Sequence, residues 1–162
     1  MRKILFILTG CLFILSCAPV ISKEIRARAS DAPFSQVVQD PGRYRGMTFI
    51  WGGTIVQTKG VNSGSLLEVV QNPLSGRGTV AERDVSYGRF LVDSQTLLDP
   101  LIYRAGRLVT VAGELAETRK GKIGEGEYLY PVLRADEIRL HEDYGGGFRF
   151  VPSIFLGIGL TD

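Results

Sequence analysis

The sequence has few of the residues from which catalytic and metal sites are usually built. Its 162 residues include one histidine, His141, and two cysteines, Cys11 and Cys17. A Ser-His-Asp or Cys-His arrangement would have to use His141, and a zinc site needs several histidine or cysteine ligands. We therefore predict that the protein is not an enzyme and has no metal or cofactor. His141 is interpreted as a polar residue at the end of the last strand.

An excess of charge of one sign is also missing. The chain has 19 Lys+Arg against 17 Asp+Glu, and Arg2 and Lys3 alone account for the difference. A nucleic-acid-binding protein usually shows a clustered basic face, and electrostatic attachment to a membrane needs a polybasic segment. We predict that the protein does not bind nucleic acid and that any membrane attachment comes from lipid chains.

The N-terminus has the pattern of a bacterial lipoprotein signal peptide. Two cations precede the apolar residues 4–15, and Ser16 leads into Cys17. Cleavage before Cys11 would leave an apolar core shorter than the roughly 7 to 15 residues that a signal peptide needs. An uncleaved anchor is the alternative, but the apolar run falls short of the roughly 20 residues that span a bilayer. We predict cleavage before Cys17, acylation of its thiol, for example by palmitate, and a lipid anchor in the bilayer.

The rest of the chain is long enough for one compact domain. We divide the sequence into a lipoprotein signal peptide (1–16), a lipidated tether (17–31), a β-barrel domain (32–142) and a glycine-rich, apolar C-terminal tail (143–162). A short basic amphipathic helix is the competing interpretation of the tether. Because Cys11 would leave with the signal peptide, the mature chain could form no internal disulfide.

The barrel domain is predicted to be all-β. Apolar and β-branched runs between glycine-rich turns indicate strands at 48–58, 65–70, 88–92, 107–115 and 128–140, with a mobile hairpin loop at 119–126. Gly52 and Gly53 suggest a bulge or bend in the first strand. A helical turn is expected at 34–38, and a short helix capped by Asp99 at 96–103. This order favours a small five-stranded OB-like Greek-key barrel, with another small barrel or sandwich as the alternative.

Five aromatic side chains are candidate contacts to a ligand or partner. Trp51 beside two glycines is either a stacking platform or a core residue, and Tyr103 either binds or orients the short helix. The tail contains Phe148, Phe150 and Phe155 but is too short and too rich in Gly and Pro to be a transmembrane helix. It either lies over the barrel as an edge strand or touches lipid or a protein partner.

Several segments resemble one known family. These are PGRYRG (41–46), WGGTI (51–55), GRFL (88–91), LDPLIY (98–103), LVTVAG (108–113), YLYPV (128–132) and EIRL (137–140). Together they resemble the Slp family of outer-membrane lipoproteins from about residue 34 to 141. His141 departs from the tryptophan that often follows in the family. The resemblance implies a starvation- or stress-associated lipoprotein of the Gram-negative outer membrane, without established enzymatic chemistry. Ala18 after the cysteine agrees with that destination.

Two hypotheses of function follow. The first is a non-enzymatic envelope lipoprotein that works through contacts with the membrane or with an envelope protein. The second is an OB-like module that binds a small molecule or a glycan in the periplasm.

Overall fold

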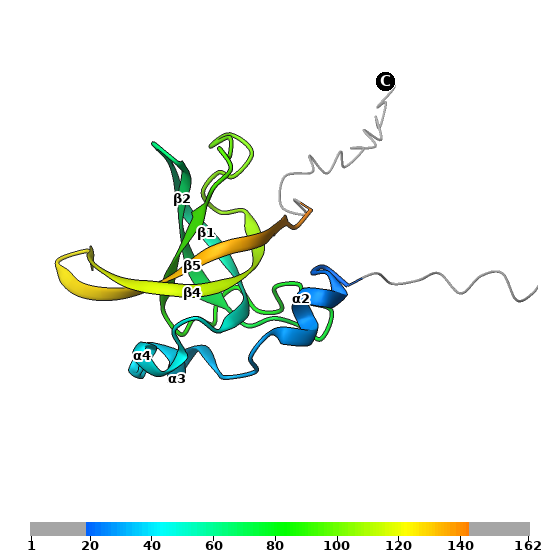
Figure 1. Ribbon diagram of the computed structural model, residues 1–162. Coiled ribbons are helices and arrows are strands. Elements are labelled where there is room, and N and C mark those ends of the chain that lie inside the picture. The colour runs from blue at the N-terminus through cyan, green and yellow to red at the C-terminus, as the bar shows by residue number, and fades with distance from the viewer. Residues whose placement is uncertain (1–18, 143–162) are drawn as a thin grey trace, which may run out of the picture.

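Five β-strands close into a barrel in the computed structural model, which describes residues 19–142 (Figure 1). The strands are β1 (Thr48–Val61), β2 (Gly64–Asn72), β3 (Arg89–Ser94), β4 (Leu108–Ile123) and β5 (Gly126–Leu140). Their order around the barrel is β1-β2-β3-β5-β4, and β1 pairs with both β2 and β4. All neighbours are antiparallel except β3 and β5. The predicted all-β, five-stranded OB-like barrel is therefore confirmed.

The barrel interior is filled by alternate residues of the strands. Phe49, Trp51 and Ile55 of β1 face inward with Val109, Val111 and Leu115 of β4, and all six side chains are at most 5% exposed. The two-residue period of a strand puts every second side chain on the inner face. A second, smaller cluster forms around Leu91, Tyr130 and Val132.

Gly52 and Gly53 lie in the part of β1 that pairs with both β2 and β4. Gly53 pairs with Gln71 on one side and with Val109 on the other. A Cβ atom at Gly53 would collide with the carbonyl oxygen of Val70, so close packing of the strands requires glycine there. The bulge that we expected at this point falls three residues later, because the register shifts between Ile55 and Gln57.

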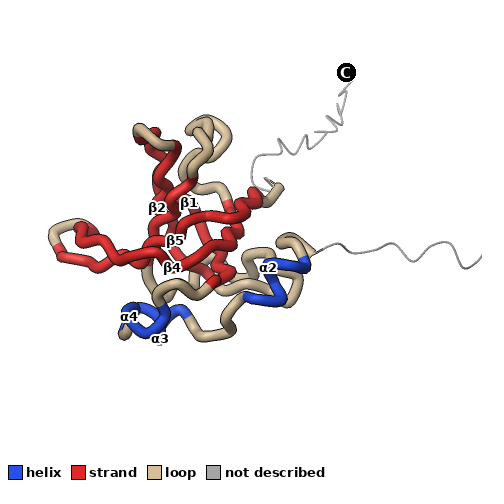
Figure 2. The backbone as a smooth tube through the Cα atoms, viewed as in Figure 1, coloured by secondary structure: helices blue, strands red, loops and turns tan. Residues whose placement is uncertain are grey.

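The expected mobile loop at 119–126 is instead part of a long hairpin. β4 and β5 pair as far as Ile123 and Gly126, which leaves only Gly124 and Glu125 in the turn. Gly124 has φ +58°, a conformation that glycine adopts without steric cost. The hairpin projects from the barrel as an arm, on the side opposite to that where the chain enters (Figures 1 and 2).

The short helix expected at 96–103 is absent, and the segment forms turns. Asp99 does accept a backbone hydrogen bond, from Leu101 at 2.8 Å, but its side chain stabilises a turn and no helix follows. Of the apolar residues at helical spacing, Leu98 is buried, whereas Leu97 and Leu101 are 74% and 83% exposed. The helical spacing of these leucines stabilises a helix only if their side chains pack together against the barrel, and two of the three do not.

One end of the barrel is instead covered by helices that precede β1. The turn predicted at 34–38 is α3 (Phe34–Gln39), and α4 (Pro41–Tyr44) follows with Asp40 as its N-cap. Phe34, Val37 and Tyr44 belong to the main core cluster. Figure 1 shows both helices at the lower end of the barrel.

The predicted tether packs on the barrel along its described part. Residues 23–28 form α2 (Lys23–Arg28), which agrees with the competing interpretation of this segment as a short helix. Ile21 is only 2% exposed, and the backbone N–H of Ser22 donates to Glu137 Oε2 at 3.0 Å. Arg28 pairs with Asp136, and Ser30 N–H donates to the carbonyl of Thr48 at 2.8 Å. This segment, termed the N-terminal strap (residues 19–31), therefore packs against the barrel from Ile21 onward.

Candidate functional site

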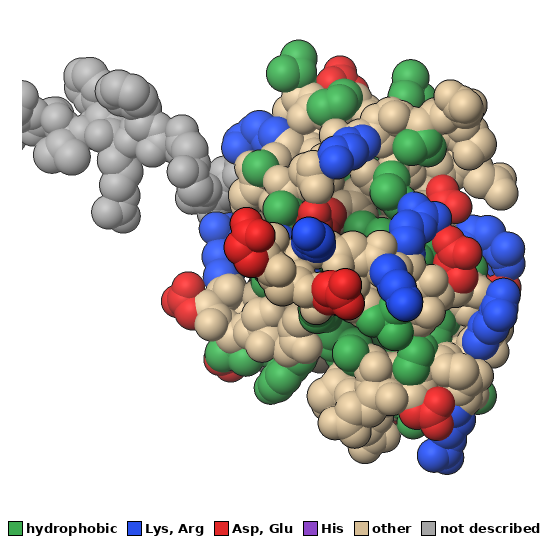
Figure 3. Space-filling model, turned by 90° about the vertical axis from the view of Figure 1, so that its left-hand side faces the viewer, with side chains coloured by type: hydrophobic (Ala, Val, Ile, Leu, Met, Phe, Trp, Pro, Cys, Tyr) green, Lys and Arg blue, Asp and Glu red, His purple; other side chains and the backbone are tan. Residues whose placement is uncertain are grey.

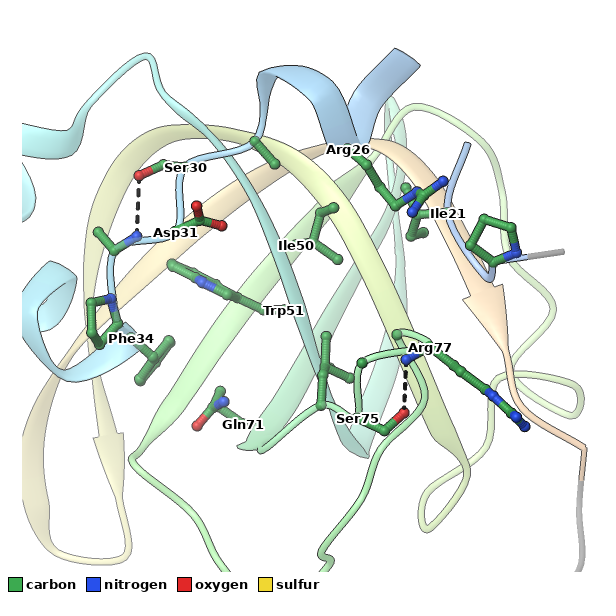
Figure 4. Close-up of a pocket in the computed structure, with 18 residues that line it drawn as sticks. Ile21, Arg26, Ser30, Asp31, Phe34, Ile50, Trp51, Gln71, Ser75 and Arg77 are labelled. Atoms are coloured by element: carbon green, nitrogen blue, oxygen red, sulfur yellow. Dashed lines mark hydrogen bonds between the residues drawn. The ribbon is translucent and has the colours of Figure 1, made fainter. Parts of the chain in front are cut away.

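A cavity lies between the N-terminal strap and the loop that follows β2. It measures about 620 Å³, within the usual range of small-molecule sites. Its walls come from the strap, from the start of α3, from β1 and the end of β2, and from loop 74–78. We call this cavity the strap pocket (Figure 4).

The apolar side of the strap pocket is aromatic and rigid. Trp51 meets Phe34 edge to face, with centroids 4.8 Å apart at 78°, and meets Phe90 at 5.3 Å and 73°. Such pairs hold both rings in fixed orientations. Trp51 is 5% exposed, so it is a core residue whose edge reaches the pocket, and its indole is not a free stacking platform.

The polar side of the strap pocket contains a buried amide with an unused acceptor. Gln71 is 7% exposed, and its Nε2 donates to the carbonyl of Asn72 at 3.0 Å. Its Oε1 has no hydrogen-bond partner within the described residues. Rotating the amide by 180° would set two oxygens against each other, so the orientation is fixed. A buried acceptor without a donor costs about 1–3 kcal/mol.

Charged side chains occupy the two ends of the strap pocket. The Asp31 carboxylate lies near Trp51 at one end, and the Arg26 guanidinium lies beside Ile21 at the other, where the chain enters (Figure 4). Both side chains come from the strap. Arg77 lines the rim, but its side chain points away from the cavity (Figure 4).

Most of this pocket is not predicted by the sequence. The alternation predicts a second strand that ends at Val70, whereas β2 continues to Asn72 and thereby buries Gln71. Arg26 and Asp31 fall in the segment 17–31, which the sequence predicts to be a lipidated tether. Continuing the alternation of β2 by two residues would have placed Gln71 in the sheet, but no pattern in the strap indicated that it would fold back on the barrel.

Of the other predicted site residues, Tyr103 lies in the part of the chain that the structure describes. Tyr103 packs against the core from the loop before β4, and its carbonyl accepts a 2.7 Å hydrogen bond from Thr58 Oγ1. It does not line the strap pocket. Cys17, Phe148, Phe150 and Phe155 lie outside the described residues, so their predicted roles stay predictions.

His141 follows β5, as the sequence predicts. Its Nε2 is 2.8 Å from Thr110 Oγ1, which itself donates to the carbonyl of Gly78 at 2.7 Å. The threonine hydroxyl has one proton, so the ring must donate and Nε2 carries hydrogen. Burial, together with the positive charge of Arg83, lowers the pKa of His141 below 6.5. The imidazole is therefore neutral at pH 7, and its partners are those of a structural residue.

A buried carboxylate lies outside the strap pocket. Glu68 is 8% exposed and accepts hydrogen bonds from Arg89 at 2.8 Å, Gln57 at 2.7 Å and Tyr130 at 3.1 Å. Burial raises the pKa of Glu68, but these donors outweigh it and the net shift is downward from 4.5. Burial and the adjacent carboxylate raise the pKa of Tyr130. Each group has a partner, so the cluster serves to join β1, β2, β3 and β5.

Within residues 19–142, no group of three or more His, Cys, Asp or Glu side chains is arranged to hold a metal ion. No helix in the same range is long and apolar enough to cross a membrane. On the face shown in Figure 3, cationic and anionic side chains are interspersed and neither sign forms a continuous patch.

The protein is thus a small OB-type barrel with a pocket of mixed polar and apolar lining beside its N-terminal strap. Residues 14–146 match the profile of the Outer membrane lipoprotein Slp family. The chain belongs to this family, and the resemblance seen in its sequence is confirmed. It is accordingly a lipoprotein of the Gram-negative cell envelope.

Two curated relatives are similar over part of their length. An uncharacterized protein of Haemophilus influenzae is 37% identical over 90 residues, which is 55% of this chain and 49% of that protein. The uncharacterized lipoprotein YeaY of Escherichia coli K12 is 31% identical over 99 residues, which is 61% of this chain and 51% of YeaY. The chain thus spans about half the length of the curated relatives it matches.

Solved structures with a similar fold are distant. The mitochondrial single-stranded DNA-binding protein Rim1 of S. cerevisiae has 17% identity and a TM-score of 0.35 over 60% of this chain and 94% of its own. A small single-stranded DNA-binding protein of Streptomyces coelicolor has 13% identity and a TM-score of 0.37, over 59% and 94%. Likeness at this level carries no argument about what this chain binds, and the absence of nucleic-acid binding stays a prediction.

Proposed function

We propose that the protein is acylated on Cys17 and holds its barrel directly against the outer membrane, where it works by binding and not by catalysis. The observation that carries this proposal is the burial of Ile21, which is 2% exposed. Ile21 follows Cys17 by four residues, and four residues reach at most roughly 14 Å. The side of the barrel that holds the strap would therefore lie at the level of the lipid head groups.

The C-terminal end of the described residues supports the same orientation. Val20, Leu140, His141 and Glu142 line one depression, so the chain enters and leaves the barrel at neighbouring points. The apolar tail at 143–162 would then begin on the membrane side. We propose that its phenylalanines add a second contact to the bilayer.

The acylation step is tested by mass spectrometry of the N-terminus of the protein purified from membranes. We expect a mature chain that begins at a lipid-modified Cys17. Cys11→Ala should leave this product unchanged, whereas Cys17→Ala should abolish it and release the protein from the membrane fraction. An unmodified Cys17, or an intact Met1, would contradict the proposal.

Contact with an envelope protein is a second candidate function. Three apolar side chains of the loop before β4 are exposed, Leu97 by 74%, Leu101 by 83% and Ile102 by 51%. Solvent-exposed apolar side chains in one loop are a common feature of interaction sites. Crosslinking in intact envelopes with a photoreactive residue at Leu101 tests this candidate, with Leu129 on the hairpin arm (40% exposed) as the matched control position.

A further inference from the structure

We propose that an exposed apolar surface at one end of the barrel inserts into the outer membrane and fixes the orientation of the barrel there. This surface, termed the loop patch, consists of the side chains of Val61, Leu97, Leu101 and Ile102. The proposal rests on the proposed function for the anchor at Cys17, and it adds a second point of contact with lipid. The experiments below separate failure of the insertion from failure of the anchor.

The four side chains of the loop patch lie at the same end of the barrel. Val61 is the last residue of β1, and the loop between β3 and β4 contributes the other three. Leu97 reaches the β1–β2 hairpin, because a Cβ atom at Gly60 would lie 3.6 Å from Leu97 Cδ1. Figure 3 shows several hydrophobic side chains on the surface at the upper end of the molecule, where Figure 1 places this hairpin. Exposed fractions in the patch range from 43% for Val61 to 83% for Leu101.

The loop that carries the patch is fixed to the barrel. The backbone N–H of Leu98 donates to Ser65 Oγ at 2.8 Å, and the Leu98 side chain is buried. At the other end of the loop, Thr58 Oγ1 donates to the carbonyl of Tyr103 at 2.7 Å. The N–H of Tyr103 in turn donates to the carbonyl of Asp99 at 2.8 Å. A loop that is already ordered loses little conformational entropy when it binds, so its exposed leucines are ready to insert.

The loop patch adjoins the point where the chain leaves the barrel. One side chain joins the two, since Arg107 Nη1 donates to the carbonyl of Ile102 at 3.2 Å and Nη2 to that of His141 at 2.8 Å. His141 lines one depression together with Val20. Val20 follows Cys17 by three residues, which reach at most roughly 11 Å. An anchor at Cys17 would therefore hold this part of the barrel close to the bilayer.

The chemistry of the loop patch favours lipid over a protein partner. All four side chains are aliphatic, whereas the residues that dominate binding at protein interfaces are mostly Trp, Tyr and Arg, and Leu and Val are under-represented among them. The charged residues of β1 from position 58, of the turn to β2 and of loop 95–107 are three cations and one anion, namely Lys59, Arg104, Arg107 and Asp99. Cations beside apolar side chains suit the boundary between head-group phosphates and acyl chains.

The depth of the loop patch in the bilayer is the direct test. An environment-sensitive fluorescent amino acid is incorporated at Leu101, and the full chain, purified from membranes, is reconstituted into vesicles of phosphatidylethanolamine and phosphatidylglycerol. Leu129, an exposed leucine on the hairpin arm, is the matched control position. We expect a blue shift and quenching by nitroxides on the lipid acyl chains at position 101, and neither at position 129. The same emission and quenching at both positions would overturn the proposal.

A charge placed in the loop patch should withdraw it from the bilayer. Leu97 is 74% exposed, so Leu97→Asp leaves the packing of the barrel intact. It should reduce the quenched fraction at position 101 at least about tenfold, because a buried leucine side chain is lost and a carboxylate is excluded from the acyl chains. Ile102→Asp should act in the same way, and Leu129→Asp on the arm should have no effect. Unchanged quenching in both patch variants would contradict insertion.

Two further measurements separate insertion from the other proposals. Quenching of a fluorophore at Gly76, on the rim of the strap pocket, by nitroxide-labelled head groups reports whether the strap faces the bilayer. Quenching at position 76 but not at position 101 would overturn the insertion alone, and quenching at neither would contradict the proposed function as well. Quenching at position 101 alone would support insertion and contradict the orientation of the strap.

Photocrosslinking at Leu101 in intact envelopes identifies the occupant of the loop patch. We expect a mass increase that corresponds to a phospholipid. A protein adduct without a lipid adduct would assign the patch to an envelope protein and would overturn the insertion.

Discussion

Replacing Ile21 by alanine should release the N-terminal strap while the barrel remains folded. Ile21 is 2% exposed but does not belong to the main core cluster, so its side chain holds the strap and not the barrel interior. Truncating a buried isoleucine to alanine costs about 2–5 kcal/mol. We take the lower part of that range, about 2–3 kcal/mol, because a peripheral segment relaxes around the lost methyl groups more readily than a core does.

Hydrogen exchange of single amides measures the effect. The amide of Ser30 donates to Thr48 across the junction of strap and barrel, and that of Val111 lies in the middle of β4. A loss of 2–3 kcal/mol corresponds to about 30- to 150-fold faster local opening, because each 1.4 kcal/mol is a factor of ten. We expect that acceleration at Ser30 and little change at Val111. Ile102→Ala, at a site that is 51% exposed, should change neither.

Two results would refute this reasoning. If Ser30 exchanges at the parental rate in the Ile21→Ala variant, the strap does not depend on Ile21. If Ser30 and Val111 accelerate together, strap and barrel unfold as one unit, and Ile21 is part of the core.

Three further predictions concern the barrel. Glu68 has a lowered pKa in the folded state, so its stabilising contribution is present above pH 4.5 and is lost as the pH falls through the folded-state pKa. In thermal melts, Glu68→Gln should lower the free energy of unfolding by about 1–3 kcal/mol at pH 7 and by clearly less near pH 3. An equal loss at both pH values would argue against this mechanism. His141→Ala should leave the envelope phenotype and localisation intact, and loss of the phenotype in a folded, correctly localised variant would end the non-enzymatic interpretation. Removing residues 148–162 should preserve the strand signal in circular dichroism and a cooperative melt, because the barrel is closed by residues up to Leu140; a collapsed transition would place the tail in the core.

The sequence predicted the barrel well because its signal is local. Alternation of Phe49, Trp51 and Ile55 with outward residues requires only that one face be buried, and this is also what positions them in the structure. The approximate positions of the five strands along the chain followed from the same pattern. Strand ends were predicted less well, since β2, β4 and β5 all run beyond the residues with clear alternation.

The predictions for residues 96–103 and 17–31 differ from the structure for one physical reason. Tertiary contacts decide the conformation of segments whose local preference is weak. Leu97, Leu98 and Leu101 have helical spacing, yet α3 and α4 already cover one end of the barrel and two of these leucines stay exposed. The polar composition of residues 17–31 indicated a tether, although one buried side chain, Ile21, and a few hydrogen bonds attach its described part to the barrel.

The strap pocket could not be predicted for the same reason. Its charged groups, Arg26 and Asp31, come from the strap, and Gln71 comes from a strand more than 40 residues later along the chain. None of these residues belongs to a recognisable motif. Their proximity follows from the folding of the strap onto the barrel, which only the structure reveals.

The distance of the barrel from the bilayer tests the central claim most directly. A fluorophore is attached to a cysteine introduced at one of two positions. The first is Gly76, on the rim of the strap pocket, and the second is Glu125, in the turn of the hairpin arm. Quenching of the fluorophore by nitroxide-labelled lipid head groups is then measured in vesicles. Position 76 has open space around it and tolerates the change. The account predicts strong quenching at position 76 and little at position 125, because the arm points away from the side where the chain enters. Equal quenching at both positions, or quenching at position 125 alone, would contradict it.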